Sequence, residues 1–485
     1  MLLGHLGRPL WRRITTVAVA ALMATAASPG TSQAAMAHGG KPGGTALAWG
    51  ANAFGQLGDG TTMSRTTPVR VCRPGQTPPC TPPLQHVRAM AGGGRHSLAL
   101  LPNGTVLAWG NNTFGQLGDG TTIGRTTPVR VCAVGQTAPC TRFLTGVRAI
   151  AAGLSHSLAL LNNGTVVAWG ANASGQVGDG TTINRLTPVR VCAPGQTAPC
   201  TRFLTGVRAI SAQSEGVFSM ALSLSGTVLS WGDNRTGQLG DGTTTNRTTP
   251  GRVCAPGQTA PCTRFLRHVR AISAGSFLSL ALRPNGTVLS WGANSFGELG
   301  DGTTINRTTP VRVCAVGQTA PCTRFLTGVR AVFGGGLWSI ALRWRGAVLS
   351  WGLNIVGELG DGTTTNRTTP VRVCAPGQTA PCTRFLTGVR AIAAGGDTTL
   401  ALRGRWPGRP VRRPRGAVLA WGLNTSGQVG DGTTINRLTP VRVCAPGQTA
   451  PCTRFLTGVR SVAAGDRHSL AISWRPPHRQ MTAAK

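Results

Sequence analysis

Short apolar runs alternate with loops rich in glycine and asparagine along most of the chain. In one representative stretch this pattern predicts four strands. The runs His96–Leu100 and Thr105–Trp109 are joined by Asn103-Gly104, a dipeptide typical of two-residue β-hairpins. Residues 128–131 alternate apolar and charged side chains, as a half-exposed strand does, and Val147–Ile150 is the fourth run. We therefore expect one small antiparallel sheet from each stretch of this kind.

The four-strand unit occurs seven times. A Trp-Gly pair closes the second strand of each copy, and successive pairs are 60, 60, 62, 60, 60 and 70 residues apart. A fixed period of this length is typical of a repeat architecture. The tryptophans are Trp49, Trp109, Trp169, Trp231, Trp291, Trp351 and Trp421. A chain of near-identical copies offers few places for a unique active site.

The ends of the repeat region predict a closed ring. A four-stranded sheet with two apolar faces cannot bury them alone, and radial stacking of such sheets gives a β-propeller. The first unit begins at Thr45 without an H-S-L-A-L strand, and the last unit ends with a spare copy, His468–Ile472. Pairing the two removes the open edge of the sheet. We predict an all-β fold over residues 45–473: a seven-bladed β-propeller of four-stranded antiparallel blades, closed by its N- and C-terminal strands.

The first 35 residues have the pattern of a secretory signal peptide. Arginines precede an apolar run at residues 14–27 that is too short to span a bilayer, and small residues lead to a cleavage site near Ala34 or Ala35. We expect a linker over residues 36–44 and a disordered tail over 474–485. The mature chain, which has no other segment able to cross a membrane, is then secreted and either free or associated with the cell wall.

The cysteines agree with export. All 14 fall in seven pairs of the form C-x7-C, one pair in each repeat. Even numbers at regular places in an exported chain are typical of disulfides, and closing a loop of this size stabilises by about 2.6 kcal/mol. A zinc site needs four ligands close together, whereas each repeat offers two thiols. The expected bridges are Cys72–Cys80, Cys132–Cys140, Cys192–Cys200, Cys254–Cys262, Cys314–Cys322, Cys374–Cys382 and Cys444–Cys452.

The repeat resembles that of the regulator of chromosome condensation family. The run W-G-x-N-x-x-G-Q-L-G-D-G-T is followed by P-V-R-V and then by V-R-A-I-x-A-G-x-x-H-S-L-A-L. The resemblance implies a seven-bladed propeller, and family functions that include nucleotide exchange on a small GTPase, chromatin binding and, in exported bacterial relatives, inhibition of β-lactamases. The chain resembles an exported, bacterial-type member. It lacks the blade insertion with which the nuclear member contacts its GTPase; the one sizeable insertion here is basic and proline-rich, at residues 403–415.

Few side chains are suited to catalysis. Seven of the 13 acidic residues occupy one repeated position in L-G-D-G-T, where an aspartate can bond nearby backbone amides and fix a turn. Calcium would need several oxygen ligands, including more than one carboxylate. Glu298 and Glu358 replace the glutamine of G-Q-L-G in neighbouring units, either as surface variation or as a carboxylate pair. There is no nucleophile elbow or phosphate-binding loop. We expect no catalytic residue, no cofactor and no metal.

Candidates for a partner face lie where the units differ. The residue at the head of the S-L-A-L strand changes between units, and ring symmetry would place all copies at one height. Together with Phe277 and the irregular segment 213–217, these residues would form a half-polar, half-apolar patch at one mouth of the ring. The alternative is that they fill the space between blades. The head residues are His468, His96, His156, Phe218, Leu278, Trp338 and Thr398.

A second variable position lies in the N-x-x-G part of each loop. Exposed aromatic side chains there would favour binding, and packing against the leucine of the same loop is the alternative. The residues are Phe54, Phe114, Ser174, Thr236, Phe296, Val356 and Ser426.

The formal net charge of +35 comes almost entirely from arginine, because lysine occurs only at Lys41 and Lys485. Arginine recurs in R-T-T-P, P-V-R-V, T-R-F-L and V-R-A. The alternation around Arg70 directs it away from the valines, which predicts a belt of guanidinium groups on the blades. Such a belt would attract polyanions, with an affinity that falls as salt rises. A coding bias towards arginine is the alternative.

These patterns favour a non-catalytic binding or scaffold propeller, monomeric, that engages a protein partner through one face. Two other functions stay open. One is binding of anionic cell-surface polymers or nucleic acid through the arginine belt. The other is guanine-nucleotide exchange, as the resemblance implies.

Overall fold

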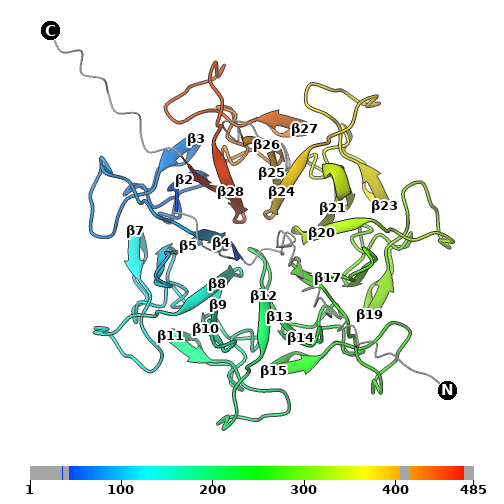
Figure 1. Cartoon of the computed structure of the whole chain (residues 1–485), viewed down its shortest axis with the longest axis horizontal. Coiled ribbons are helices and arrows are strands. Elements are labelled where there is room, and N and C mark those ends of the chain that lie inside the picture. Colours follow the sequence, from blue (N-terminus) through cyan, green and yellow to red (C-terminus); the bar gives the residue numbers. More distant parts are fainter. Residues whose placement is uncertain (1–34, 37–42, 405–415, 475–485) are drawn as a thin grey trace, which may run out of the picture.

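Seven four-stranded antiparallel sheets surround a central axis in the computed structural model, which describes residues 35–36, 43–404 and 416–474 (Figure 1). The predicted all-β, seven-bladed propeller is confirmed. All but the last residue of the predicted leader, most of the basic insertion and most of the tail lie outside the described residues. Among the described residues no helix has the length and apolar character needed to cross a membrane.

Each blade has an inner, a second, a third and an outer strand, arranged from the axis to the rim. The inner strands are β4 (Ala89–Gly92), β8 (Val147–Ala152), β12 (Val207–Ser211), β16 (Ala271–Ala274), β20 (Val329–Gly334), β24 (Val389–Ala394) and β28 (Val459–Ala464). The second strands are β5 (His96–Leu100), β9 (His156–Leu161), β13 (Phe218–Ser223), β17 (Leu278–Leu282), β21 (Trp338–Arg343), β25 (Thr398–Arg403) and β29 (His468–Ser473).

The remaining strands complete the blades towards the rim. The third strands are β2 (Thr45–Gly50), β6 (Val106–Gly110), β10 (Val166–Gly170), β14 (Val228–Gly232), β18 (Val288–Gly292), β22 (Val348–Gly352) and β26 (Ala417–Gly422). The outer strands are β3 (Arg65–Arg70), β7 (Arg125–Arg130), β11 (Arg185–Arg190), β15 (Arg247–Arg252), β19 (Arg307–Arg312), β23 (Arg367–Arg372) and β27 (Arg437–Arg442). A single 3-10 turn, η1 (Trp344–Gly346), joins β21 to β22.

Burial of the apolar faces of each sheet stabilises the stacking of the blades. Every residue of the third strand β6 is buried, as is every residue of β5 beside it, because neighbouring blades cover both faces of the sheet. The outer strand β7 is only partly covered. Apolar side chains therefore gather in layers between blades, and each layer draws on two consecutive blades.

The last strand of the chain closes the ring. β29 pairs antiparallel with β2, with Leu47 opposite Ala471, so that one blade has the strand order β28-β29-β2-β3. The indole Nε1 of Trp49 donates to the Gln428 carbonyl in the preceding blade at 2.9 Å. Trp109 makes the same bond to Gln56. The joint between the chain ends thus uses the same contacts as the joint between consecutive repeats, and the predicted closure is confirmed.

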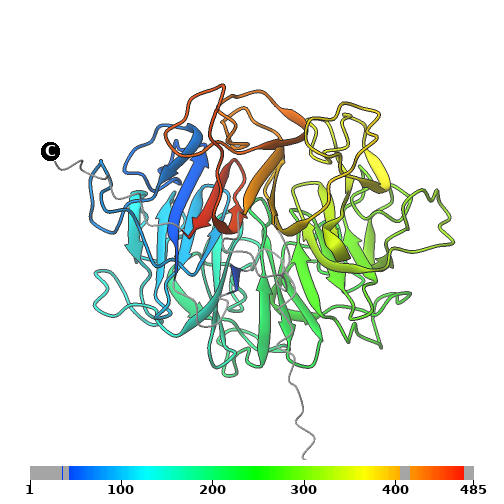
Figure 2. The same cartoon turned by 45° about the horizontal axis from the view of Figure 1, so that its top comes forward.

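A short additional strand lies inside the ring. β1 (Ala35–Met36), whose two residues fall in the expected leader and linker, pairs with the inner strand β8, with Ala35 opposite Ile150. Gly44 then forms an isolated bridge with Val87. Figure 2, in which the ring is turned by 45°, shows the blades arranged around the axis with their connecting loops at the two ends and the rim.

Candidate functional site

The residues at the heads of the second strands lie between blades, not on a mouth of the ring. Their side chains are at most 2% exposed. In five blades a glycine follows the inner strand, and a Cβ on that glycine would lie 2.0–2.7 Å from the head residue, so the missing side chain makes the room that the head residue fills. Phe277 alone among the candidates is half-buried. The expected patch of His96, His156, Phe218, Leu278, Trp338, Thr398 and His468 is therefore wrong, and these side chains fill the inter-blade space.

Three of these head residues are neutral histidines that tie blades together. The Ser157 hydroxyl donates to the Gln116 carbonyl at 2.9 Å, so its oxygen accepts a hydrogen bond from His96 Nε2 at 3.0 Å. Nε2 therefore carries the proton. His156 and Ser219, and His468 and Ser97, repeat this bond.

Burial keeps these imidazoles uncharged. Complete burial, with smaller contributions from His156 and His468, lowers the pKa of His96 to about 3. Burial alone lowers the pKa values of His156 and His468 to about 4. The folded state binds fewer protons than the unfolded state, so the three groups stabilise the fold above their ordinary pKa of 6.5, and this stability is lost as pH falls towards 4.

Two families of loops form one end of the ring, which we call the turn face. One family follows the inner strands and the other follows the third strands. The two families are hydrogen-bonded together: Asn111 N donates to the Arg95 carbonyl at 2.8 Å, and Ala51 N bonds Arg467 in the same way. The variable positions of the repeat therefore gather at this end.

The turn face exposes aromatic and aliphatic side chains. The N-x-x-G phenylalanines Phe54, Phe114 and Phe296 are 37%, 43% and 37% exposed. Ile355, beside the same position in another loop, is 63% exposed. The guanidinium of Arg95 lies 4.6 Å from the ring centre of Phe54. Packing inside the loop does not cover these phenylalanines, and the binding alternative stays open for them.

The irregular segment 213–217 spans the mouth of the ring at this end. Gln213 Nε2 donates to the Gly395 carbonyl at 3.0 Å, in a loop three blades away. The Ser276 hydroxyl bonds Gln213 Oε1 and Glu215 Oε2 at 3.1 and 2.9 Å. The two residues by which this repeat exceeds its 60-residue neighbours thus lie in a loop that reaches across the mouth.

Three carboxyl groups, one of which belongs to this segment, lie close together at the mouth. Burial, and then the charges of Asp466 and Asp397, raise the pKa of Glu215 to about 8, and Glu215 shares a hydrogen bond with Asp466. Burial also raises the pKa values of Asp397 and Asp466. No cluster able to hold a metal ion occurs in the described ranges. Because these carboxyls are far apart in sequence, only the ring geometry reveals that they meet.

The repeated aspartate fixes its loop, as the sequence predicts. Asp119 Oδ1 accepts bonds from the backbone N and the hydroxyl of Thr121, at 3.0 and 2.8 Å. Asn112 Nδ2 donates to the same oxygen, a role that the motif alone does not reveal. The second oxygen pairs with Arg125 at 2.9 Å. The same ion pair, at 2.5–3.4 Å, recurs in Asp59–Arg65, Asp179–Arg185, Asp241–Arg247, Asp301–Arg307, Asp361–Arg367 and Asp431–Arg437.

The expected arginine belt consists of four different sets. The R-T-T-P arginines are paired with aspartates, as above. In six blades the arginine of P-V-R-V, or of P-G-R-V in one of them, lies over the phenylalanine of T-R-F-L. Arg130, for example, is 5.3 Å from the ring centre of Phe143. The T-R-F-L arginines, such as Arg142, are exposed on the rim loops. The V-R-A arginines lie on the inner rim, where Arg148 reaches the Val207 carbonyl of the next blade.

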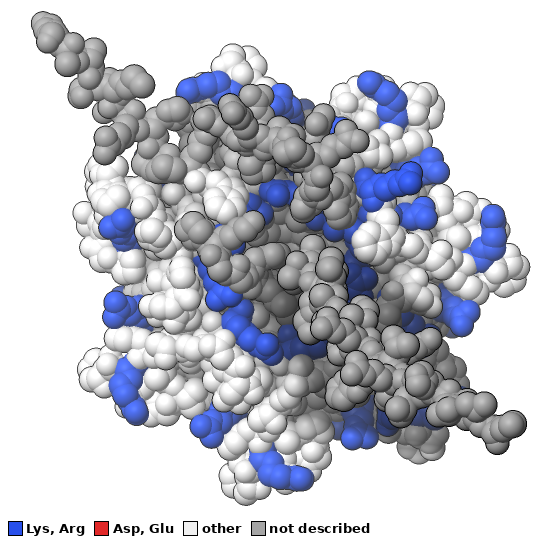
Figure 3. All heavy atoms as spheres, viewed as in Figure 1, with Lys and Arg blue, Asp and Glu red and all other residues white. Residues whose placement is uncertain are grey.

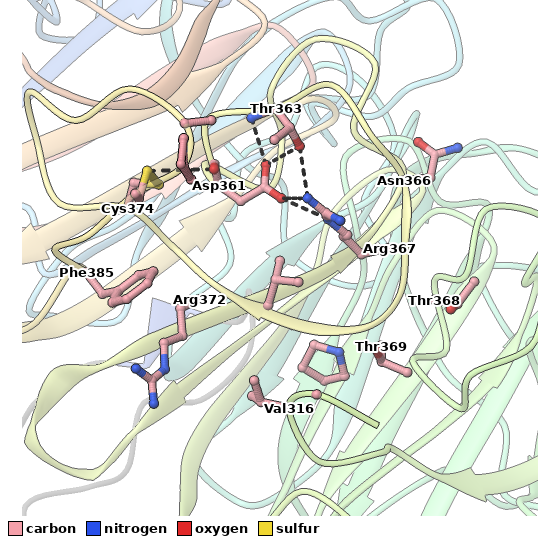
Figure 4. Close-up of a pocket in the computed structure, with 16 residues that line it drawn as sticks. Val316, Asp361, Thr363, Asn366, Arg367, Thr368, Thr369, Arg372, Cys374 and Phe385 are labelled. Atoms are coloured by element: carbon pink, nitrogen blue, oxygen red, sulfur yellow. Dashed lines mark hydrogen bonds and ion pairs between the residues drawn. A yellow bond between two sulfur atoms is a disulfide. The ribbon is translucent and has the colours of Figure 1, made fainter. Parts of the chain in front are cut away.

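All seven expected disulfides are formed, with bridged Cα atoms 4.7–5.8 Å apart. A groove of about 790 Å³ lies on the outer rim between two of the bridged loops, beside β23 (Figure 4). Its carboxylate, Asp361, points towards Thr363 and Arg367 and pairs with both (Figure 4). The groove therefore presents no unengaged acid or base, and the turn face is the stronger candidate site.

Comparisons with known proteins agree with this architecture. The model of the regulator of chromosome condensation (RCC1) repeat matches residues 43–100, 103–160, 163–211, 225–282, 285–342, 345–402 and 415–472. The ultraviolet-B receptor UVR8 of Arabidopsis thaliana is 27% identical over 398 residues, which cover 81% of this chain and 76% of the receptor. The secretion-regulating guanine nucleotide exchange factor of Bos taurus is 28% identical over 458 residues, 89% of this chain and 83% of that protein.

A solved structure shows the same fold at lower identity. Prp20p of Saccharomyces cerevisiae, a protein whose binding to Gsp1p and histones has been described, superposes with a TM-score of 0.63. The two are 21% identical, and the superposition covers 90% of this chain and 92% of Prp20p.

Proposed function

The chain belongs to the regulator of chromosome condensation repeat family, and from this premise we propose that it is an exported, non-catalytic binding propeller that engages a protein partner through the turn face. Relatives that bind proteins, such as Prp20p with Gsp1p and histones, support a binding role. The proposal shifts the contact from the buried head residues to the loops just above them.

The observation that carries the proposal is the composition of the turn face. Exposed phenylalanines stand beside exposed arginines, and aromatic and arginine side chains are enriched in the energetically important parts of protein interfaces. Arg95 over Phe54 joins both kinds of group in one contact. Arg235, whose side chain is 70% exposed, lies in another loop of this face.

The turn face is also where the repeats differ. The seven copies are almost identical along most of their strands and in their Asp-Gly turns, as the fold requires. They differ at the N-x-x-G positions and in the loops after the inner strands, both of which lie on the turn face. A face with a different side chain in each blade can distinguish the parts of an asymmetric partner. The outer rim repeats nearly the same side chains seven times and cannot.

Seven disulfides support the exported part of the proposal. Disulfides persist in oxidising compartments and are rare in the cytosol. Guanine-nucleotide exchange is the second candidate, favoured by the likeness to the Bos taurus exchange factor. Exchange on a cytosolic GTPase would take place in the reducing cytosol, so cell fractionation separates the two functions. The mature chain is expected in the medium or wall fraction, and its accumulation in the cytosol would favour exchange.

Capture with matched variants tests the turn face. The triple variant Phe54→Ser, Phe114→Ser, Phe296→Ser introduces the residue that Ser174 and Ser426 already supply at this position, so the fold should persist. The control is Ile123→Thr, Ile183→Thr, Ile305→Thr, in exposed loop positions where Thr245 and Thr365 stand in other repeats.

Immobilised mature protein is then exposed to extracellular proteins at moderate salt. We expect a partner that is retained by the wild type and by the isoleucine control, and lost with the phenylalanine variant. Equal retention by all three forms, or equal loss from both variants, would contradict binding through these phenylalanines of the turn face.

A further inference from the structure

Negatively charged side chains are unevenly distributed between the two ends of the ring. All 13 carboxylates lie in the described residues. Seven are the repeated aspartates, each paired with an arginine at the start of an outer strand. The other six lie in the loops of the turn face: Glu215, Asp233, Glu298, Glu358, Asp397 and Asp466. The end where the inner strands begin therefore has no carboxylate in its loops.

At that end each repeat places one arginine on the inner rim. We call this set the arginine ring, and its members are Arg88, Arg148, Arg208, Arg270, Arg330, Arg390 and Arg460. Six of these are half-buried and Arg330 is 7% exposed. The face shown in Figure 3 agrees with this separation, because Lys and Arg atoms surround the central hollow and no Asp or Glu atom is in view.

Hydrogen bonds to backbone carbonyls of neighbouring blades hold four of the seven guanidinium groups. Arg148 Nη2 donates to the Val207 carbonyl at 2.6 Å, and Val207 directly precedes the next ring arginine. Arg390 Nη2 makes the same bond to Val459 at 2.6 Å. Arg208 donates to Val269, and Arg330 donates to the Arg390 carbonyl at 2.7 Å. These four arginines therefore each have one anchored edge and a fixed position against the next blade.

The ring concentrates positive charge, and four of its members have no carboxylate partner among the described residues. None of the ion pairs found among the described residues involves Arg148, Arg208, Arg270 or Arg390. Burial, and then the charge of Arg270, lower the pKa of Arg330 to about 10. Burial and the charge of Arg88 likewise lower the pKa of Arg460. Partly desolvated like charges side by side favour an anionic ligand that touches several of them at once.

We propose that the arginine ring is a binding site for a short polyphosphate chain. The planar guanidinium matches phosphate oxygens in a two-bond geometry, and the backbone anchors preorganise it. A single phosphate would contact few members of the ring, whereas consecutive phosphates can follow it from blade to blade. Duplex DNA carries its charges on a convex surface and would instead meet the exposed arginines of the rim loops. This site is at the opposite end of the ring from the turn face and does not depend on the proposed function.

Matched charge variants test the site by calorimetric titration of the mature chain with sodium tripolyphosphate. The ring variant is Arg148→Gln, Arg208→Gln, Arg390→Gln. The control, Arg142→Gln, Arg202→Gln, Arg384→Gln, removes the same charge from exposed rim-loop positions. At an ionic strength near 0.15 M, charges beyond about 8 Å are largely screened, so we expect the control to change the affinity by less than about threefold. We expect the ring variant to weaken binding by at least about 100-fold.

A single substitution keeps the test open if the triple ring variant unfolds. The Arg270 side chain makes no hydrogen bond within the described residues, so Arg270→Gln removes a charge without removing a tie between blades. We expect about tenfold weaker tripolyphosphate binding with an unchanged melting temperature in the absence of ligand. Equal weakening in ring and control variants would overturn the proposal in favour of a net-charge effect. Absence of tripolyphosphate binding, or tighter binding of duplex DNA that depends on the rim arginines, would also overturn it.

Discussion

Glutamine and glutamate exchange places at one buried position of the repeat. Five copies have glutamine in G-Q-L-G or G-Q-V-G, and the remaining two have Glu298 and Glu358. One carboxyl oxygen of Glu358 accepts from Val356 N at 2.9 Å, and the other is buried without a partner among the described residues. Burial raises the pKa of Glu358 to about 7, and that of Glu298 is also raised. The protonated acid therefore imitates the amide of the other copies, and surface variation is not the explanation of these residues.

Glu358→Gln is accordingly expected to stabilise the protein at alkaline pH. The folded-state pKa lies above the ordinary value, so the stability contributed by the wild-type carboxyl is full below pH 4.5 and is lost as pH rises through about 7. At pH 8 the variant should gain on the order of 3 kcal/mol in the free energy of unfolding, and near pH 4 almost nothing. Urea denaturation at the two pH values measures the difference.

The reverse exchange in another blade is the control. Gln116 occupies the same buried position, and Gln116→Glu should lower the free energy of unfolding at pH 8 while leaving it nearly unchanged near pH 4. If the two substitutions change the free energy of unfolding by the same amount and in the same direction at both pH values, the carboxyl at this position is not desolvated.

Some residue-level features were readable from the sequence and others were not. The repeated aspartate was assigned correctly to its turn, because Asp in L-G-D-G-T needs only local partners such as Thr121. For the head residues the sequence left two interpretations, a patch at the mouth or filling of the space between blades, and burial supports the second. The sequence shows that these residues vary but not that a glycine of the same blade leaves the space they fill. Phe54 and its equivalents could be recognised as variable, but only the structure shows them exposed.

At the scale of the element, each blade combines strands with a disulfide-closed rim loop. Alternation predicted the strands, but it placed the outer strand over residues 128–131, whereas β7 is Arg125–Arg130. The polar first half of β7 pairs with β6 beyond a bulge, so that Gly110 lies opposite Arg125. A hydrophobic pattern does not reveal an extension of a strand by polar residues. The rim loop returns to the Asp-Gly turn: Cys132 N donates to Gly118 O at 2.8 Å.

Removing one rim disulfide should lower the free energy of unfolding by the loop-closure contribution of that bridge, without changing the fold. For Cys192→Ser with Cys200→Ser we expect the free energy of unfolding to fall by about 2.6 kcal/mol, because the unfolded state is no longer constrained by the closed loop. Urea unfolding under oxidising conditions measures this loss. The same comparison with all disulfides reduced is the control, in which the two proteins should coincide; equal midpoints under oxidising conditions would contradict a stabilising role for the bridge.

At the scale of the whole molecule, the closed ring places variable loops at one end and uniform arginines at the other. The sequence predicted seven blades and their closure, because the divided first unit and the spare last strand are both visible in it. It did not predict that the segment 213–217 reaches Gly395 across the mouth, or that the V-R-A arginines link one blade to the next. Those contacts join residues that only the circular arrangement brings together.

Both proposed binding ends depend on the ring being closed by β29, and C-terminal truncation tests that claim most directly. Deleting residues 466–485 removes β29, whereas deleting 475–485 leaves every described strand in place. We expect the longer deletion to abolish the cooperative thermal transition or lower its midpoint by more than about 10 °C, because the third strand β2 and the inner strand β28 lose their partner. The shorter deletion should melt as the full mature chain does. Identical melting of the two truncated proteins would contradict the closed ring.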